Sequence, residues 1–165
     1  MSYQQATVLD TPIGGIGVFV ADGAVTSVSF GAVRSEEPDG PGGLEPVLAD
    51  AVGELAAYFA GDRLEFSVAT VLVRGSEFER AVWGQIAAIP YGETRSYGSI
   101  AHAVGEPGGA QAVGLACNRN PLPLIIPCHR VIGSDGKLVG FGGGLHRKQW
   151  LLQLEARVWI ERAFS

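Results

Sequence analysis

Alternation of apolar and polar positions near the start of the chain predicts three short strands. They cover residues 7–9, 16–21 and 25–30, and the connections between them are rich in glycine. The dipeptide Asp22-Gly23 lies between two of these apolar runs, and Asp-Gly in such a place is a strong signal for a β-hairpin. We therefore expect a small antiparallel sheet.

The next periodic stretch predicts a helix from Pro46 to Ala60. Proline suits the first turn of a helix, and Gly61 marks its end. Apolar residues at helical spacing indicate one buried stripe, formed by Val47, Val52, Leu55 and Phe59. Residues 64–71 are predicted to return as a further strand, and the polar residues 31–43, rich in glycine and proline, as an exposed loop.

The second half of the chain predicts four helices around turn-rich segments. Residues 76–79 read Ser-Glu-Phe-Glu, the spacing of a capping box, and predict the start of a helix. Trp83 lies on this helix and is expected to point into the core. Residues 96–104 and 110–117 predict two short helices around a glycine-containing turn, the pattern of a helix-turn-helix. A last helix is expected from His146, with an inward face formed by Trp150, Leu151, Leu154 and Val158.

Length and composition limit the class of protein. A chain of 165 residues can bury one good core or two small ones. No apolar run approaches the roughly 20 residues that span a bilayer, and the first residues lack the features of a signal peptide. The two cysteines make no disulfide framework, so we expect a cytoplasmic protein in a reducing compartment.

Charge is distributed unevenly along the chain. Residues 1–73 contain two basic and ten acidic side chains, a net of −8, whereas residues 74–165 contain ten basic and seven acidic ones, a net of +3. Such asymmetry indicates that the second half binds a polyanion. We expect a scaffold domain over residues 1–73 and a second domain over residues 74–165.

The candidate chemistry centres on the segment Pro127-Cys128-His129-Arg130. An apolar run broken by Pro123 predicts an extended, buried stretch that delivers the cysteine and the histidine side by side. A thiol becomes a nucleophile when a neighbouring base or positive charge favours the thiolate, and both kinds of neighbour follow here. Taken alone, a Cys-His pair is more often a small buried residue beside a surface histidine.

Four motifs taken together resemble the O6-alkylguanine-DNA alkyltransferases, the suicide repair proteins that move an alkyl group from a damaged guanine to a cysteine. The motifs are Asn-Pro at 120–121, Pro-Cys-His-Arg-Val at 127–131, Gly-Phe-Gly-Gly-Gly at 140–144 and Leu-Leu-Gln-Leu-Glu at 151–155. The resemblance covers residues 76–155. It implies an α+β protein, with an N-terminal ribonuclease H-like antiparallel sheet and helix and a C-terminal helix-turn-helix domain.

The resemblance also implies roles for individual residues in a methylated-DNA--protein-cysteine methyltransferase that acts once. Cys128 would accept the alkyl group of O6-alkylguanine, and His129 would activate it through water. Glu155 would orient the imidazole, Asn120 would hold the turn around the reactive site, and Tyr97 would donate its hydroxyl hydrogen to the leaving base. The thioether product cannot be cleaved, so the transfer is stoichiometric and irreversible.

Further residues are expected to contact the guanine and the DNA. The guanine pocket would be lined by Val131, Phe141, Gly142, Gly143 and Lys148. The expected DNA contacts are Ala110, Gln111, Ala112, Gly114, Arg119 and Arg130. Relatives usually carry arginine where this chain has Gln111, and glutamine lacks the charge and the planar group that stacks in the helix. Binding or flipping of the nucleotide is therefore expected to be weaker here.

The expected partner is double-stranded DNA that bears O6-alkylguanine, bound by a monomer with no cofactor, no metal and no membrane contact. Some relatives hold zinc in the N-terminal region, which here contains no cysteine and no histidine. One alternative is a thiol acceptor of the same fold that uses a free base or a small alkylating agent. A lesion-sensing binder is disfavoured by the intact Cys128, and a Cys-His hydrolase by its place after an extended run.

Overall fold

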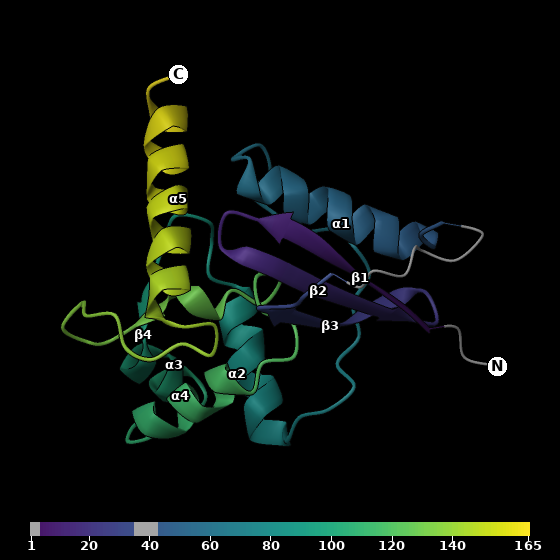
Figure 1. The fold of residues 1–165 in the computed structure, drawn as a ribbon. Coiled ribbons are helices and arrows are strands. Elements are labelled where there is room, and N and C mark those ends of the chain that lie inside the picture. Colours follow the sequence, from purple (N-terminus) through teal and green to yellow (C-terminus); the bar gives the residue numbers. More distant parts are fainter. Residues whose placement is uncertain (1–3, 35–42) are drawn as a thin grey trace. The chain divides into compact units, whose positions relative to one another are not determined.

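The chain divides into two units, Met1–Val73 and Arg74–Ser165, in the computed structural model, which describes residues 4–34 and 43–165. A sheet and one helix form the first unit, and helices dominate the second (Figure 1), so the predicted α+β class is confirmed. Of the loop predicted at residues 31–43, residues 35–42 lie outside the described part of the chain.

The first unit contains an antiparallel sheet with the strand order β1-β2-β3. Strands β1 (Gln4–Thr11), β2 (Gly14–Ala21) and β3 (Ala24–Phe30) include and extend the three predicted strands. Between β2 and β3, Asp22 and Gly23 have φ angles of 51° and 83°, as a two-residue turn between twisted strands requires. The predicted Asp-Gly hairpin is confirmed.

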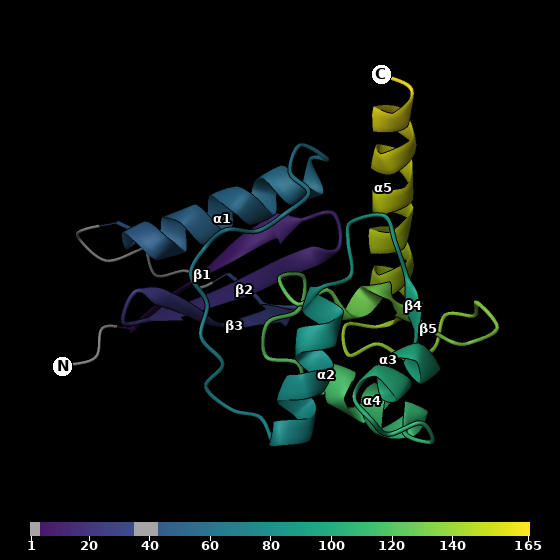
Figure 2. The ribbon, with the colours of Figure 1, turned by 180° about the vertical axis from the view of Figure 1, so that it is seen from behind.

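Helix α1 (Pro46–Phe59) contacts all three strands and lies along the sheet (Figure 2). Its N-terminus is capped by Glu45, whose carboxylate accepts hydrogen bonds from the backbone N–H groups of Val47 and Leu48. Proline at the first helical position confirms the predicted start, because this position needs no N–H donor.

The buried face of α1 differs from the predicted stripe. The residues in the core are Leu48, Ala51, Leu55 and Tyr58. Val47, Val52 and Phe59 are half-buried, so the prediction was correct at Leu55 alone. The observed residues follow one another at intervals of three and four, which places them on one line of the helix, with the predicted residues on either side of it.

Residues 64–71 do not form the predicted strand. They make one parallel bridge, in which Val25 donates to the carbonyl of Ala69 at 2.8 Å and accepts from the N–H of Val71 at 3.0 Å. Glu54 of α1 accepts hydrogen bonds from the backbone N–H groups of Ser67 and Val68 at 2.9 and 3.2 Å. The helix carboxylate thus takes donors that a sheet ladder would otherwise use.

The second unit is built mainly from helices. Its elements are α2 (Glu77–Ala87), β4 (Arg95–Ser96), α3 (Tyr97–Ala103), α4 (Ala110–Asn118), the 3₁₀ helix η1 (Cys128–Arg130), β5 (Val131–Ile132) and α5 (Leu145–Ala163). The short strands β4 and β5 pair in parallel (Figure 2). Ser76 and Glu79 form the predicted capping box at the start of α2. Helices α3 and α4 confirm the two predicted helices of the helix-turn-helix.

The core of the second unit joins α2 to α4 and α5 to η1. Trp83 is 1% exposed, and its Nε1–H donates to the carbonyl of Ala116 at 2.8 Å, so its predicted core position is confirmed. On α5 the predicted inward residues Leu151, Leu154 and Val158 are buried, while Trp150 is half-buried. Among the helices in the described residues, none is both long enough and apolar enough to span a bilayer.

Candidate active site around Cys128

The segment that leads to Cys128 is folded into turns, and the prediction of an extended stretch was wrong. Leu124 has a φ of 75°, in the left-handed region, and the N–H of Ile126 donates to the carbonyl of Leu122 at 2.8 Å. The prolines of the segment cannot donate to a strand ladder. Turns closed by a neighbouring side chain satisfy the remaining backbone groups instead.

That side chain belongs to Asn120, which makes three hydrogen bonds. Its Oδ1 accepts from the N–H of Leu122 at 2.8 Å, and its Nδ2 donates to the carbonyl of Ile126 at 2.8 Å. The same Nδ2 lies 3.1 Å from Sγ of Cys128. Because a backbone N–H only donates and a carbonyl only accepts, these contacts fix the orientation of the amide. The amide therefore connects the loop to the sulfur.

Cys128 begins η1 and is 3% exposed. Burial raises the pKa of this thiol well above its ordinary value because the thiolate loses its solvation, and a hydrogen bond with Cys117 raises it further. The hydrogen bond from Asn120 and the charge of Lys148 lower the pKa but do not outweigh burial. The sulfur is thus a thiol in this arrangement, whereas the sequence led us to expect a thiolate.

His129 and Arg130 meet Glu155 of α5 in a buried cluster. Nε2 of His129 lies 2.6 Å from Oε2 of the carboxylate, and Nε of Arg130 donates to Oε1 at 2.7 Å. Nη2 of the arginine donates to Oε2 at 3.0 Å, and Nη1 donates to the carbonyl of Ile89 at 2.7 Å. None of the three side chains is more than 7% exposed. One carboxylate therefore serves an imidazole and a guanidinium together.

The carboxylate determines which nitrogen of His129 carries the proton. Burial lowers the pKa of His129, although the hydrogen bond to Glu155 acts in the opposite direction, so the imidazole is neutral. A carboxylate only accepts hydrogen bonds, which places the imidazole proton on Nε2. Nδ1 is then an acceptor, and within the described residues it has no hydrogen-bond partner. This nitrogen can receive a proton.

The buried cluster predicts loss of stability in acid. Burial would raise the pKa of Glu155, but the contacts with His129 and Arg130 outweigh it and lower the pKa to about 2. The carboxylate thus stabilises the fold above its ordinary pKa of 4.5, by about 3 kcal/mol, and this contribution is lost as the pH falls toward 2. His129 lowers the stability at a higher pH than Glu155 does. Below the ordinary imidazole pKa of 6.5 the unfolded chain binds a proton at this residue, while the folded imidazole stays neutral.

Urea unfolding between pH 8 and pH 3 is expected to show a decline that begins near pH 6.5 and steepens below pH 4.5. Exposed His102 provides the control, since replacing it with asparagine is expected to leave this profile unchanged. A free energy of unfolding that stays constant from pH 8 to pH 5 would contradict a neutral, buried His129.

Tyr97 and Lys148 form a second buried pair in this unit. Nζ of Lys148 donates to the phenol oxygen at 3.2 Å and to the carbonyl of Val139 at 2.9 Å. The phenol hydroxyl in turn donates to the carbonyl of Gly140 over a long 3.4 Å. Burial raises the pKa of Tyr97 to about 12, so the hydroxyl keeps its proton. A hydroxyl that is held by a cation and weakly engaged as a donor can turn its hydrogen toward a ligand.

The remaining residues predicted to line a guanine pocket differ in exposure. Val131 and Gly143 are buried, Phe141 is half-buried and Gly142 is exposed. A Cβ on Gly142 would meet only the carbonyl oxygen of Asn118, at 3.8 Å, which is an ordinary contact. Space around this glycine is therefore available to a ligand.

The start of α4 presents the predicted DNA contacts to solvent. Ala110, Gln111 and Ala112 are exposed, while Gly114 is half-buried. Its N-cap residue, Gly109, provides no side chain to cap the first N–H groups. Arg119, beyond the other end of α4, is 73% exposed in its side chain and lies 3.4 Å from the carboxylate of Glu79.

Arg130 is the exception among the predicted DNA contacts. Its guanidinium is 7% exposed and bound to Glu155, so it is not available to a phosphate. This expectation is corrected, because an arginine can be buried when a carboxylate neutralises its charge. Lys148 is likewise fully buried, although its place beside Tyr97 keeps it among the residues near a candidate base pocket.

Two features of the site were missed from the sequence. One is Arg130 as the second partner of Glu155, which could have been inferred because a carboxylate on an apolar helix face needs a cation. The other is Cys117 of α4, which raises the pKa of the Cys128 thiol. No sequence signal links these two cysteines, because their relation depends on the turns of the segment between them.

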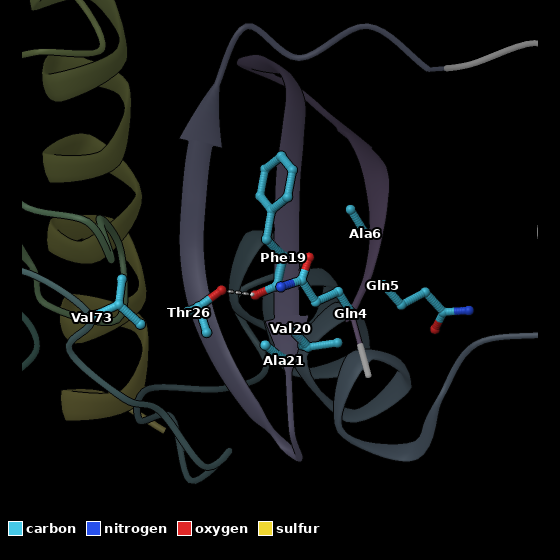
Figure 3. A pocket seen from close by; sticks show the side chains of 8 residues that line it. All are labelled: Gln4, Gln5, Ala6, Phe19, Val20, Ala21, Thr26 and Val73. Atoms are coloured by element: carbon cyan, nitrogen blue, oxygen red, sulfur yellow. Dashed lines mark hydrogen bonds between the residues drawn. The ribbon is translucent and has the colours of Figure 1, made fainter. Parts of the chain in front are cut away.

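A cavity of about 480 Å³ lies on the first unit (Figure 3). It is lined by Gln4, Gln5, Ala6, Phe19, Val20, Ala21, Thr26 and Val73. The hydroxyl of Thr26 donates to the carbonyl of Phe19 at 3.3 Å beside it. Among the residues that the structure describes, none of those lining the cavity carries an acid, a base or a thiol.

The sequence matches known proteins over most of its length. The family model described as 6-O-methylguanine DNA methyltransferase, DNA binding domain, matches residues 77–157. A methylated-DNA--protein-cysteine methyltransferase of Mycolicibacterium paratuberculosis is 50% identical over 151 residues, which cover 90% of each chain. A protein of the same name from Methanosarcina acetivorans is 44% identical over 90% of this chain and 96% of its own.

Solved structures give the same result. The crystal structure of Mycobacterium tuberculosis OGT in complex with DNA has a TM-score of 0.81 and 43% identity, and the match covers 93% of each chain. An O6-methylguanine DNA methyltransferase from Methanococcus jannaschii has a TM-score of 0.64 and 28% identity, over 94% of this chain and 93% of its own. The chain belongs to the 6-O-methylguanine DNA methyltransferase family.

Proposed function

We propose that this protein repairs O6-alkylguanine in double-stranded DNA by transferring the alkyl group to Sγ of Cys128, once per molecule. The observation that carries the proposal is the adjacent His129, which Glu155 holds with Nδ1 free to take a proton. The close relatives named methylated-DNA--protein-cysteine methyltransferases and the OGT–DNA complex support the substrate. The reaction uses no cofactor, because the acceptor and the base are both side chains.

The transfer is a substitution at the alkyl carbon. The thiol proton passes through a water molecule to Nδ1 of His129, the sulfur attacks the carbon, and the bond from that carbon to O6 of guanine breaks. Glu155 holds the imidazole and stabilises the imidazolium that forms. Burial keeps Cys128 protonated until the base acts. The sulfur is therefore protected from chance alkylation while it waits for its substrate.

Guanine leaves as an anion unless it receives a proton. The hydroxyl of Tyr97 is the donor we assign to this step, because Lys148 directs an N–H at its oxygen and leaves the hydroxyl hydrogen to be redirected. The target base lies inside the duplex, so the nucleotide has to be flipped out, at a few kcal/mol. The helix-turn-helix of residues 74–165 binds the DNA as a monomer in this proposal, and residues 1–73 form the scaffold.

Intact-protein mass after incubation with an O6-methylguanine duplex tests the proposal. We expect a gain of one methyl group, located by tryptic digestion on the peptide of residues 120–130, and no gain in Cys128→Ser. A parallel incubation with free O6-methylguanine separates duplex repair from transfer off a small alkyl donor. Repeated turnover by one molecule, or a methyl group on another peptide, would contradict a single-use Cys128.

Gln111 predicts a measurable weakness in DNA binding. The side chain is exposed on the first turn of α4 and can hydrogen-bond a base, but it carries no charge. Gln111→Arg is expected to tighten binding to methylated duplex, and to speed single-turnover transfer, by about tenfold, since stacking on a base contributes roughly 1–3 kcal/mol. Fluorescence anisotropy and rapid-quench assays measure the two effects.

The matched control is Gln153→Arg, which adds the same charge at an exposed position of α5. A general gain in attraction to phosphates would appear equally in both variants and would fall steeply with salt. A gain restricted to position 111 supports insertion of this side chain into the duplex. Equal behaviour of the two variants and of the wild type would remove any role for Gln111 in flipping.

A further inference from the structure

The segment between α2 and β4, which runs beside α5 (Figure 2), contacts both partners of the buried ion pair between Arg130 and Glu155. The carbonyl of Ile89 accepts from Nη1 of Arg130 at 2.7 Å, and the ring centre of Tyr91 lies 5.5 Å from the guanidinium carbon. The backbone N–H of Gly92 donates to Oε1 of Glu155 at 3.4 Å. The segment therefore contacts the carboxylate at Oε1, whereas the imidazole is held by Oε2.

Gly92 is the third residue of a tight turn. The N–H of Glu93 donates to the carbonyl of Pro90 at 3.1 Å, and Gly92 has a φ of 82°, as a type II turn requires at this position. A residue with a side chain would be strained in this conformation. The turn directs the N–H of Gly92 toward α5, where Glu155 accepts it.

Trp159 packs against the same glycine. Glu155 and Trp159 are four residues apart on α5, so their side chains lie one turn apart on one face of the helix. A Cβ on Gly92 would lie only 3.2–3.3 Å from Cβ, Cγ and Cδ2 of Trp159, closer than side chains normally pack. Since glycine has no Cβ, the tryptophan can approach the backbone of the turn. Trp159 is 53% exposed, so this contact accounts for much of what its side chain touches.

A cavity of about 270 Å³ borders both the turn and Glu155. Its lining includes Gly92, Leu152, Glu155 and Ala156. Side chains beside a cavity can move more easily than those enclosed by close packing. The contact between Trp159 and Gly92 therefore opposes a shift of the turn that the neighbouring space would allow.

We propose that Gly92 and Trp159 are positioning residues for alkyl transfer. Trp159 fixes the turn, and the N–H of Gly92 fixes Oε1 of Glu155. The carboxylate in turn keeps the proton of His129 on Nε2, so Nδ1 stays available as the base. The effect on the reaction rests on the function proposed for Cys128, whereas the effect on the imidazole does not.

Three variants of α5 separate this contact from a general effect on the helix. Trp159→Ala removes Cγ and Cδ2 from the turn and is expected to slow single-turnover transfer by about tenfold, since small misplacements of reacting groups are costly. Trp159→Phe keeps Cβ, Cγ and a Cδ atom, so it is expected to rescue the rate. Ile160→Ala truncates a side chain of similar exposure, 56% against 53%, and is expected to transfer as the wild type does.

Nitrogen NMR of histidine-labelled protein observes the imidazole directly, whether or not the alkyl group is transferred. The chain has three histidines, and replacing the exposed His102 and His146 with asparagine assigns their signals. We expect the wild type and Trp159→Phe to hold the His129 proton on Nε2, and Trp159→Ala to show a mixture of the two tautomers. Circular dichroism establishes that each variant is folded under the conditions of both measurements.

Slower transfer and a mixed tautomer, both in Trp159→Ala and in neither of the other variants, support the proposal. An unchanged tautomer in Trp159→Ala would overturn it even if transfer slows, because the contact would then not act through Glu155. An unchanged rate, or a Trp159→Ala protein that does not fold, would overturn it as well. Absence of transfer in every protein, with the tautomer altered in Trp159→Ala alone, would refute the function proposed for Cys128 and leave the positioning of His129 intact.

Discussion

Replacing Glu155 with glutamine is expected to lower the free energy of unfolding by about 3–5 kcal/mol, because it leaves the guanidinium of Arg130 buried without a counter-charge. Glutamine offers one acceptor oxygen and one NH₂ group. The native carboxylate accepts from His129 and twice from Arg130, so the NH₂ group of the variant would face a donor. Urea unfolding at pH 7.5 measures the loss.

The same substitution is expected to slow single-turnover alkyl transfer on the order of 10²–10⁴-fold, the usual contribution of a positioned general base. The matched control is Glu161→Gln on the same helix. Glu161 is 66% exposed in its side chain and lies 3.9 Å from Arg157, so its removal is expected to change stability by no more than about 0.5 kcal/mol.

A double variant separates the structural effect of Glu155 from its chemical one. Arg130→Met combined with Glu155→Gln removes the unpaired charge, so much of the lost stability is expected to return. The slow transfer is expected to persist, because His129 still lacks the carboxylate that orients it. If transfer recovered together with stability, Glu155 would serve the fold and not the reaction.

Sequence reasoning was most successful where the signal and the structure involve neighbouring residues. The turn at Asp22-Gly23, the capping box of Ser76 and Glu79, and the proline at the start of α1 each depend on atoms a few positions apart. Their backbone conformations follow from local sterics and local hydrogen bonds. The motifs around Cys128 identified the family for a different reason, because they resemble known proteins.

Sequence reasoning failed where the position of a residue depends on a partner that is distant in sequence. Arg130 was expected on DNA and Lys148 in the guanine pocket, because charged residues are rarely fully buried. Glu155 and Tyr97 bury them instead. The strand predicted at residues 64–71 failed for the same reason, since Glu54 takes its donors. Only tertiary structure brings these groups together.

Replacing Asn120 with aspartate is expected to be the most damaging change in the loop before Cys128. Aspartate keeps the acceptor for the N–H of Leu122 but turns the Nδ2 donor into a second oxygen, which faces the carbonyl of Ile126 and the sulfur. Two hydrogen bonds are lost and a carboxylate lies against two acceptors, at about 2–4 kcal/mol of stability. The negative charge also opposes formation of a thiolate, so transfer is expected to fall at least about 10²-fold.

The pH dependence of transfer distinguishes this electrostatic effect from simple loss of the loop. Asn120→Ala removes all three hydrogen bonds without adding charge, so it is expected to lose stability while its pH–rate profile moves less. Asn120→Asp is expected to move the profile to higher pH, because the negative charge raises the pKa of Cys128 further. Asn118→Asp, at an exposed position on the same helix end, controls for charge alone. If the Asn120→Asp and Asn118→Asp profiles coincide with that of the wild type, the amide of Asn120 does not act on the sulfur, and its three hydrogen bonds serve only to fold the loop.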